Sequence, residues 1–360
     1  MSQKIKIPIT EIKTFLNRAS AIKPDTHIPI SSFVRLKGEL DKTSMYKSGQ
    51  ASFIIHEVDV ENEDPFDFLI EEKSLSIACE NTNSNTILFE PEGDIINITV
   101  GNYKQSSPTE DVILFYKFPE FENSFLHTLT GDILDSINAA SKYAHAGKDF
   151  ITNVCFVHVS NNAVCATDNK KSYYKKFEVE LPDLVLSLNS CSVLAKFGSV
   201  KVKEIEKFYL FNTGSSIYGF SKEEYKAPDF NRAFNTVQEI KRPGFSVKKD
   251  SLFTFADKSH KLSSGFIDVI EISDSDRQEI QLGFKSDTVK ASTFAKIDVQ
   301  KKEGYSEPVP FLVSAGILKQ VLSSLTPETI DVCFASLGQS QFLIFSEDKN
   351  QISFIMGMSA

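Results

Sequence analysis

An amphipathic helix pattern recurs three times in this chain, beginning near Thr10, Thr130 and Lys249, at intervals of about 120 residues. In each copy the apolar residues follow the i, i+3, i+4, i+7 spacing that gathers side chains on one helix face. They are Ile12, Phe15, Leu16, Ala19 and Ile22 in the first copy, Ile133, Ile137, Ala140 and Ala144 in the second, and Leu252, Phe253, Ala256 and Ser259 in the third. The expected N-caps are Thr10, Thr130 or Asp132, and Asp250. The repeat predicts three similar domains, at residues 1–121, 122–243 and 244–360.

Each copy continues with strand-like sequence and a second, shorter helix, expected at residues 71–81, 189–197 and 314–325. Between the helices, apolar and polar residues alternate with the period of half-buried strands, as in residues 208–211 and 342–345. Phe118-Pro-Glu-Phe and Ala227-Pro-Asp-Phe each end a domain, because proline stops a strand. We therefore place the domain joints near Phe121 and Pro243. The expected fold class is α+β, with two helices packed on antiparallel sheet in every domain.

Composition narrows the class of protein. The chain contains no run of about 20 apolar residues and does not begin with the apolar core of a signal peptide, so we expect a cytoplasmic protein without a membrane segment. Its five cysteines are scattered and never form Cys-x-x-Cys, which favours reduced thiols over disulfides or zinc. The net charge of −9 argues against nucleic-acid binding by the whole surface and leaves room for a local basic stripe.

The usual catalytic constellations are missing from the sequence. It has no phosphate-binding loop, no Gly-x-Gly-x-x-Gly and no His-Glu-x-x-His, and its six histidines lie far apart. No catalytic residue, metal ligand or cofactor is expected. The most polar cluster, Ala166-Thr-Asp-Asn-Lys-Lys-Ser-Tyr, is typical of a turn with a solvated lysine pair, and a catalytic loop is the alternative.

Three motifs resemble those of the bacterial sliding clamp, the β subunit of the replicative DNA polymerase. Ala166-Thr-Asp-Asn-Lys-Lys is similar to the family's Ala-Thr-Asp-Gly-His-Arg, and Ala227-Pro-Asp-Phe-Asn-Arg to its Phe-Pro-Asp-Tyr-Arg-Arg. The final Phe354-Ile-Met-Gly-Met is similar to its closing Val-Met-Pro-Met. The motifs stand in the family's order, and the resemblance spans almost the whole chain. It implies three clamp domains and a head-to-tail homodimer of six domains closed into a ring.

The resemblance also implies partners: double-stranded DNA bound without sequence preference, a clamp loader and a DNA polymerase. Helices would line the hole, and their basic residues would face the phosphates without reading bases. The basic residues on the polar helix faces are Lys13, Arg18, Lys73, Lys142, Lys196, Lys258, Lys261 and Lys319. Asp135 and Asp257 lie among them, so the lining is not uniformly positive.

Partners of the family insert a short apolar peptide between the second and third domains. Carried over by motif, the pocket comprises Ile151, Thr167, Asn169, Lys170, Lys171, Pro228, Arg232, Phe354, Met356 and Met358. Methionine and phenylalanine suit such a pocket because they adapt to several apolar anchors. The family's Gly-His-Arg-Leu is replaced by Asn169-Lys-Lys-Ser, and its proline between the methionines by Gly357. We hypothesise a divergent clamp, encoded by a phage or plasmid, with a wider and more basic pocket.

The sequence leaves other functions open. One alternative is a clamp-like platform that recruits transcription or repair proteins. Another is a phage structural protein built from repeated α+β domains. A hydrolase or transferase is disfavoured by the missing catalytic constellation.

Overall fold

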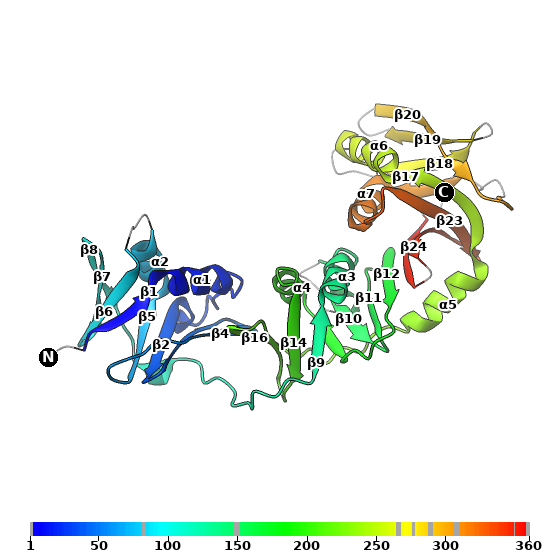
Figure 1. The fold of residues 1–360 in the computed structure, drawn as a ribbon. Helices are drawn as coiled ribbons and strands as arrows, with labels where there is room; N and C mark the ends of the chain where they lie inside the picture. The colour runs from blue at the N-terminus through cyan, green and yellow to red at the C-terminus, as the bar shows by residue number, and fades with distance from the viewer. Residues whose placement is uncertain are drawn as a thin grey trace. The chain divides into compact units, whose positions relative to one another are not determined.

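The computed structural model describes residues 3–80, 84–146, 152–263, 268–275, 278–286, 291–305, 310–348 and 350–357. The fold is α+β, as predicted, and the strand pairs in its four sheets are antiparallel (Figure 1). The chain divides into two compact units, each described by itself. Unit 1 combines Met1–Thr130 with Phe197–Lys222, and unit 2 combines Gly131–Lys196 with Glu223–Ala360. Among the helices of the described residues, none is long and apolar enough to span a membrane.

Unit 1 contains two sheets. The four-stranded sheet has the order β1 (Ile5–Pro8), β6 (Thr86–Glu92), β7 (Ile95–Val100), β8 (Tyr103–Pro108). The eight-stranded sheet has the order β5 (Phe66–Glu71), β2 (Phe33–Glu39), β3 (Lys42–Ser48), β4 (Ser52–Val58), β16 (Ser216–Ser221), β15 (Phe208–Asn212), β14 (Ser199–Glu204), β9 (His127–Thr130). Short 3₁₀ turns, η1 (Pro29–Ser32) and η2 (Val112–Leu114), complete the unit.

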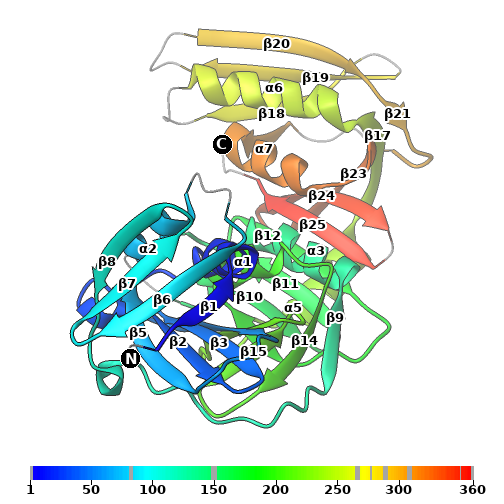
Figure 2. The ribbon, with the colours of Figure 1, turned by 60° about the vertical axis from the view of Figure 1, so that its left-hand side comes forward.

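Two helices fill the space between the sheets of unit 1. Helix α1 (Ile9–Ala19) contacts β1 and β4, and α2 (Glu72–Cys79) contacts β5, β7 and β8 (Figure 2). The predicted apolar face of α1 is buried at Ile12, Phe15 and Ala19. The predicted cap Thr10 is wrong, because α1 begins one residue earlier, at Ile9, directly after β1. Burial of Ile9 in the core, rather than a capping side chain, sets this start.

Unit 2 also contains two sheets. The nine-stranded sheet has the order β13 (Leu184–Leu186), β10 (Val157–Ser160), β11 (Ala163–Thr167), β12 (Lys171–Lys176), β25 (Gln351–Met356), β24 (Ser340–Asp348), β23 (Thr329–Leu337), β17 (Arg242–Lys248), β21 (Gln300–Lys301). The four-stranded sheet has the order β20 (Ala291–Asp298), β19 (Glu279–Ser286), β18 (Val269–Asp274), β22 (Phe311–Ser314). A 3₁₀ turn, η3 (Asn153–Cys155), precedes β10.

Four helices of unit 2 form two pairs. Helix α3 (Gly131–Ser141) packs on α4 (Leu188–Leu194), and α6 (Lys249–Leu262) packs on α7 (Ala315–Ser324). The predicted cap Asp250 is wrong, since α6 starts at Lys249, immediately after β17. The buried face of α6 includes Phe255 and not Phe253, because Leu252, Phe255, Ala256 and Ser259 follow the i, i+3, i+4, i+7 spacing.

A further helix, α5 (Phe230–Ile240), lies where the sequence predicted only a connector. Asp229 caps it by accepting a hydrogen bond from the Arg232 N–H at 3.0 Å. Phe230, Phe234 and Val237 pack α5 on the nine-stranded sheet. The helix therefore covers the face of that sheet opposite α3, which packs on β10, β11 and β12.

The two long sheets repeat one strand order. In unit 1, β5-β2-β3-β4 continues through β16-β15-β14-β9; in unit 2, β13-β10-β11-β12 continues through β25-β24-β23-β17. We call the β4–β16 pairing joint 1 and the β12–β25 pairing joint 2. Each joint pairs strands from two successive predicted domains. We call the face of joint 1 opposite α1, and the face of joint 2 opposite α3, its outer face.

Candidate functional site

The outer face of joint 2 gathers several of the predicted pocket residues. Directly paired residues of antiparallel strands share a face. Thr167 pairs with Ser172, and Ser172 with Phe354. On the next strand Phe342 pairs with Met356. Thr167, Phe354 and Met356 are therefore brought together on one surface, where the side chain of Met356 is 37% exposed.

The turn before β12 closes one end of this surface. Asn169 adopts a positive φ of 69°, which asparagine tolerates better than most residues. The Thr167 hydroxyl accepts from the Asn169 N–H, and the Asp168 carboxylate accepts from the N–H groups of Lys170 and Lys171. The Lys170 carbonyl accepts from the Met356 N–H at 2.8 Å. This network holds Asn169 and Lys170 exposed beside the apolar residues.

Helix α5 forms the opposite wall. Its Phe234 and Val237 belong to the apolar cluster that includes Phe354 and Phe342, whose rings meet edge to face at 5.8 Å. Pro228 precedes α5 and lines a cavity of about 390 Å³ together with Tyr174. Arg232 lies exposed on the first turn of α5. The wall can therefore offer a partner both apolar contacts and a cation.

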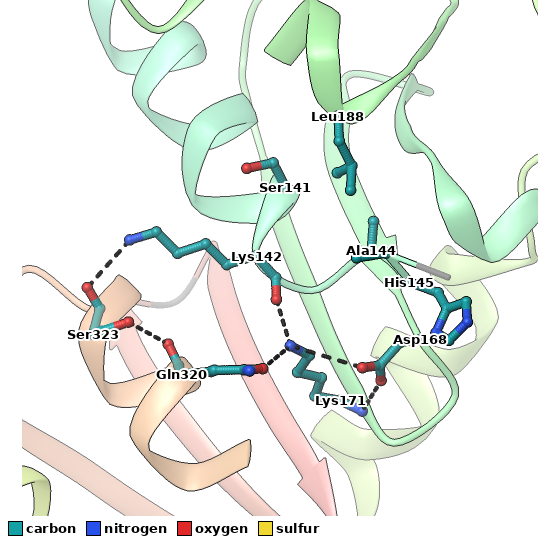
Figure 3. A pocket seen from close by; sticks show the side chains of 10 residues that line it. Ser141, Lys142, Ala144, His145, Asp168, Lys171, Leu188, Gln320 and Ser323 are labelled. Atoms are coloured by element: carbon teal, nitrogen blue, oxygen red, sulfur yellow. Dashed lines mark hydrogen bonds and ion pairs between the residues drawn. The ribbon is translucent and has the colours of Figure 1, made fainter. Parts of the chain in front are cut away.

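Lys171 lies on the opposite face of joint 2 and is not part of this surface. It is 5% exposed, and its Nζ donates to the Lys142 carbonyl and the Gln320 side chain, beside the carboxylate of Asp168 at 3.7 Å (Figure 3). Burial lowers the pKa of Lys171, while Asp168 acts in the other direction. The cavity here, about 510 Å³, is lined by Lys142, Lys171 and Ser323 among others. Lys171 thus connects α3, β12 and α7.

Ile151 and Met358, the remaining predicted pocket residues, lie outside the described residues. The sequence reasoning missed Phe342 and the whole of α5. Phe342 had been recognised only as part of a strand, because pairing with Met356 is not visible in sequence. A signal for α5 was present: Phe230, Phe234 and Val237 stand at i, i+4 and i+7.

The basic residues predicted to face DNA differ in their surroundings within unit 1. Lys13 on α1 and Lys73 on α2 are exposed. Arg18 is half-buried, and its Nη1 donates to the hydroxyls of Ser215 and Ser216 at 2.7 and 2.8 Å. Arg18 therefore ties α1 to the start of β16, whereas the two lysines remain exposed to solvent.

In unit 2 the predicted basic residues fall into two groups. Lys142, Lys196 and Lys258 are exposed, and the Lys142 Nζ donates to the Ser323 carbonyl at 3.3 Å. Lys261 and Lys319 both pair with Asp257, at 2.6 and 2.7 Å. Hydrogen bonds from these two lysines lower the pKa of Asp257 to about 2. The Asp257 carboxylate thus offsets part of the positive charge of the α6–α7 pair.

Solved structures of known proteins resemble the chain over its full length. The sliding clamp of the Bacillus subtilis DNA polymerase matches with a TM-score of 0.87 and 16% identity, covering 100% of both chains. The DNA polymerase β subunit of Streptococcus pyogenes matches with a TM-score of 0.86 and 17% identity, over 99% of this chain and 100% of that one. The DNA polymerase III β subunit of Thermotoga maritima matches with a TM-score of 0.83 and 15% identity, over 99% of this chain and 100% of that one.

No family model matches the sequence, and no curated protein matches it either. The likeness is therefore visible in the fold and not in overall sequence similarity. The fold is that of the bacterial DNA polymerase sliding clamps, which confirms the resemblance inferred from the three motifs.

Proposed function

We propose that this protein is a DNA sliding clamp, a non-enzymatic processivity factor that encircles duplex DNA and tethers a polymerase to it. The observation that carries the proposal is the likeness to three sliding clamps with TM-scores of 0.83 to 0.87 over essentially the whole of each chain. The clamp loader that opens the ring and the polymerase that uses it would be its protein partners.

DNA would be held by the exposed lysines of the helices. Lys13, Lys73, Lys196 and Lys258 present flexible cations that attract phosphates without fixing a register, which suits sliding. The net charge of −9 would repel DNA from the rest of the surface. Lys261 and Lys319 would contribute less, because both already pair with Asp257.

A head-to-tail homodimer would close the ring through the free edges of the two small sheets. Strand β8 ends the sheet of unit 1, and β20 ends the small sheet of unit 2. Unpaired edges of this kind are templates for pairing with another chain. Tyr103 on β8 and Phe294 on β20 are 45% and 67% exposed, so each edge offers an aromatic side chain to cover.

The outer face of joint 2 would dock the partner's peptide. Phe354 and Met356 would receive apolar anchors, and Phe342 would extend the apolar floor. Lys170 and Arg232, exposed on opposite sides of that floor, would favour a peptide carrying acidic residues. Asn169 would border the entrance from the turn before β12.

A threading experiment tests the ring without needing the loader. The protein is incubated with linear duplex DNA blocked at one end, the other end is then closed with a bulky block, and the DNA is washed at high salt. A ring stays on the doubly blocked DNA and leaves when the duplex is cut, because salt removes phosphate contacts but not topological linkage. Equal retention on cut and uncut DNA would contradict the proposal.

The matched control is Phe294→Asp, which places a charge on the β20 edge. It should give a monomer of 40.3 kDa that binds DNA at low salt and is lost in the wash. A neutral control is Glu180→Gln, at an exposed position between β12 and β13, which should leave retention unchanged.

A further inference from the structure

The outer face of joint 1 is covered by the chain itself. Phe53 and Ile55 on β4, Leu210 on β15 and Ile217 on β16 form a buried apolar cluster. The connector between the first two predicted domains, residues 109–126, runs over this cluster. Its Phe118, Phe121 and Phe125 pack on it and are half-buried. We call residues 116–121 of this connector the plug.

The plug is held mainly by aromatic rings. The Phe118 ring lies 5.0 Å from that of Phe53, edge to face, and 5.2 Å from that of Tyr46. Tyr116, 39% exposed, stands edge to face on Phe118 at 5.3 Å. Edge-to-face and tilted ring pairs of this kind stabilise a contact beyond what burial of their surface contributes. Phe118 is therefore the central anchor of the plug.

Backbone hydrogen bonds between the plug and the sheet are absent from the described part of the chain. The connector is fixed on either side instead. Before the plug, the Thr109 hydroxyl donates to the Leu69 carbonyl of β5 at 2.6 Å. After it, the Lys203 Nζ donates to the Glu122 carbonyl at 2.8 Å. Pro119 has no N–H to donate. A segment held by side chains alone, without a strand ladder, is attached in the manner of a docked peptide.

The plug occupies the place in joint 1 that the docking face and α5 occupy in joint 2. In joint 1 this is the face opposite α1, which contacts β4, and in joint 2 it is the face opposite α3, which contacts β12. The two covering segments also share a motif, Phe118-Pro-Glu-Phe in one and Ala227-Pro-Asp-Phe in the other. In joint 2 the second aromatic, Phe230, packs on Cys165 and Tyr174.

We propose that joint 1 carries a second peptide-docking surface, and that the plug is its resident ligand. A partner segment with two aromatic residues separated by two others, as in Phe118-x-x-Phe121, docks there by displacing the plug. This inference concerns unit 1 alone and requires neither ring closure nor docking at joint 2. It gives the protein a surface that is closed until an aromatic peptide competes for it.

The chain contains no tryptophan, so Phe118→Trp supplies a single fluorescent reporter of the plug. The full-length variant is titrated with a synthetic peptide of residues 115–125 that keeps the native phenylalanines. Displacement moves the indole into water and shifts its emission to the red, saturably. The plug is tethered to its site by the chain, which gives it an effective concentration in the millimolar range. The peptide concentration at which half of the plug is displaced, the midpoint of the titration, should therefore also be millimolar. Adding Phe121→Ser, which removes one anchor, should lower the midpoint at least tenfold.

The control peptide carries serine at both positions corresponding to Phe118 and Phe121, and it should cause no shift. Tyr116→Trp is a second reporter, at an exposed position where the larger ring can be accommodated without repacking the core. Combining either reporter with Met356→Ser in joint 2 should leave the titration unchanged. A red shift in neither reporter at several millimolar peptide, or equal shifts with native and control peptides, would overturn the proposal.

Discussion

The two joints share a strand order and differ in which strand carries the large side chain. In joint 1, Phe53 on β4 pairs with Gly219 on β16, and its ring fills the space that a Cβ on Gly219 would need, at 2.2 Å. In joint 2, the small Ser172 on β12 pairs with Phe354 on β25. Phe53 is 1% exposed under the plug, whereas Phe354 remains half-buried. Joints with the same strand order therefore differ in how completely their outer faces are covered.

On the helical faces the joints are more alike. Each is crossed by one cation, Arg18 from α1 to Ser216 in joint 1, and Lys171 from β12 to Gln320 of α7 in joint 2. The difference between the joints therefore lies on their outer faces, where partners would dock.

The largest expected effect separates the two phenylalanines. Phe53→Ala should destabilise unit 1 by about 3–5 kcal/mol, because it leaves a cavity in a closed cluster. Phe354→Ala should cost unit 2 only about 1–2 kcal/mol, since part of its ring already contacts water. Urea unfolding followed by hydrogen exchange of β4 and β12 amides measures both. Equal losses of stability in the two variants would mean that Phe53 and Phe354 are equally well packed, and would contradict the difference between the joints.

The small residues that pair with Phe53 and Phe354 provide a second contrast between the joints. Gly219→Val should destabilise joint 1 by about 2–3 kcal/mol, because the added Cβ overlaps the buried ring of Phe53. In joint 2 the small residue that pairs with a phenylalanine is Ser172. Ser172→Ala should cost only about 1 kcal/mol, the value of the hydrogen bond from Ser172 to the Thr167 hydroxyl. Thermal unfolding of both variants compares them. A neutral Gly219→Val would mean that the Phe53 ring can move aside.

Lys171 and Arg18, the cations that cross the two joints, should both stabilise the fold, and Lys171 should do so by the larger free energy. Lys171→Met should cost about 2 kcal/mol, because it removes the hydrogen bonds that the buried Lys171 cation donates to the Lys142 carbonyl and the Gln320 side chain. Arg18→Met should cost about 1 kcal/mol, since Arg18 is only half-buried. Hydrogen exchange at β16 and β25 reports each joint separately. If Arg18→Met lowered stability more than Lys171→Met, the contacts of Arg18 on the helical face would matter more to joint 1 than we infer from its covered outer face.

The smallest expected effect is a pH dependence of joint 1. Burial, and then the Arg18 cation, lower the pKa of His56 below its usual 6.5, although Glu11 opposes the change. The unfolded chain therefore binds more protons than the folded protein below about pH 6.5, and stability falls as the pH drops through that value. Exchange of β4 amides at about pH 5 and pH 7.5 should show the loss. His56→Gln should reduce it, and an unchanged loss would assign it to other groups.

How much the sequence could predict depended on the range of the interactions. The i, i+3, i+4 spacing located α1, α3 and α6, because helix periodicity is local. Strands such as β15 and β24 were also recognised from their alternation. Helices α1 and α6 begin two residues before the starts that Thr10 and Asp250 would give as N-caps, and neither helix has a capping side chain.

The candidate site was predictable only as far as motif resemblance carried it. Thr167, Asn169 and Lys170 lie near Phe354 and Met356, while their binding role stays a prediction. Lys171 lies on the opposite face because side chains alternate along β12, so its neighbour Ser172 faces the docking surface instead. The plug could not be foreseen, because the contact between Phe118 and Phe53 joins segments far apart in the chain.

Joint 1 also has a consequence for synthesis of the chain on the ribosome. His56 on β4 bonds to Ser216 on β16, which lies 160 residues later. At translation rates of about 5–20 residues per second, β4 emerges about 8–30 s before its partner strand exists. Throughout that interval the nascent chain presents the bare edge of β4, and until the plug emerges it also presents the rings of Phe53 and Tyr46. Because the plug is translated before β16, it can cover those rings while the edge of β4 is still unpaired.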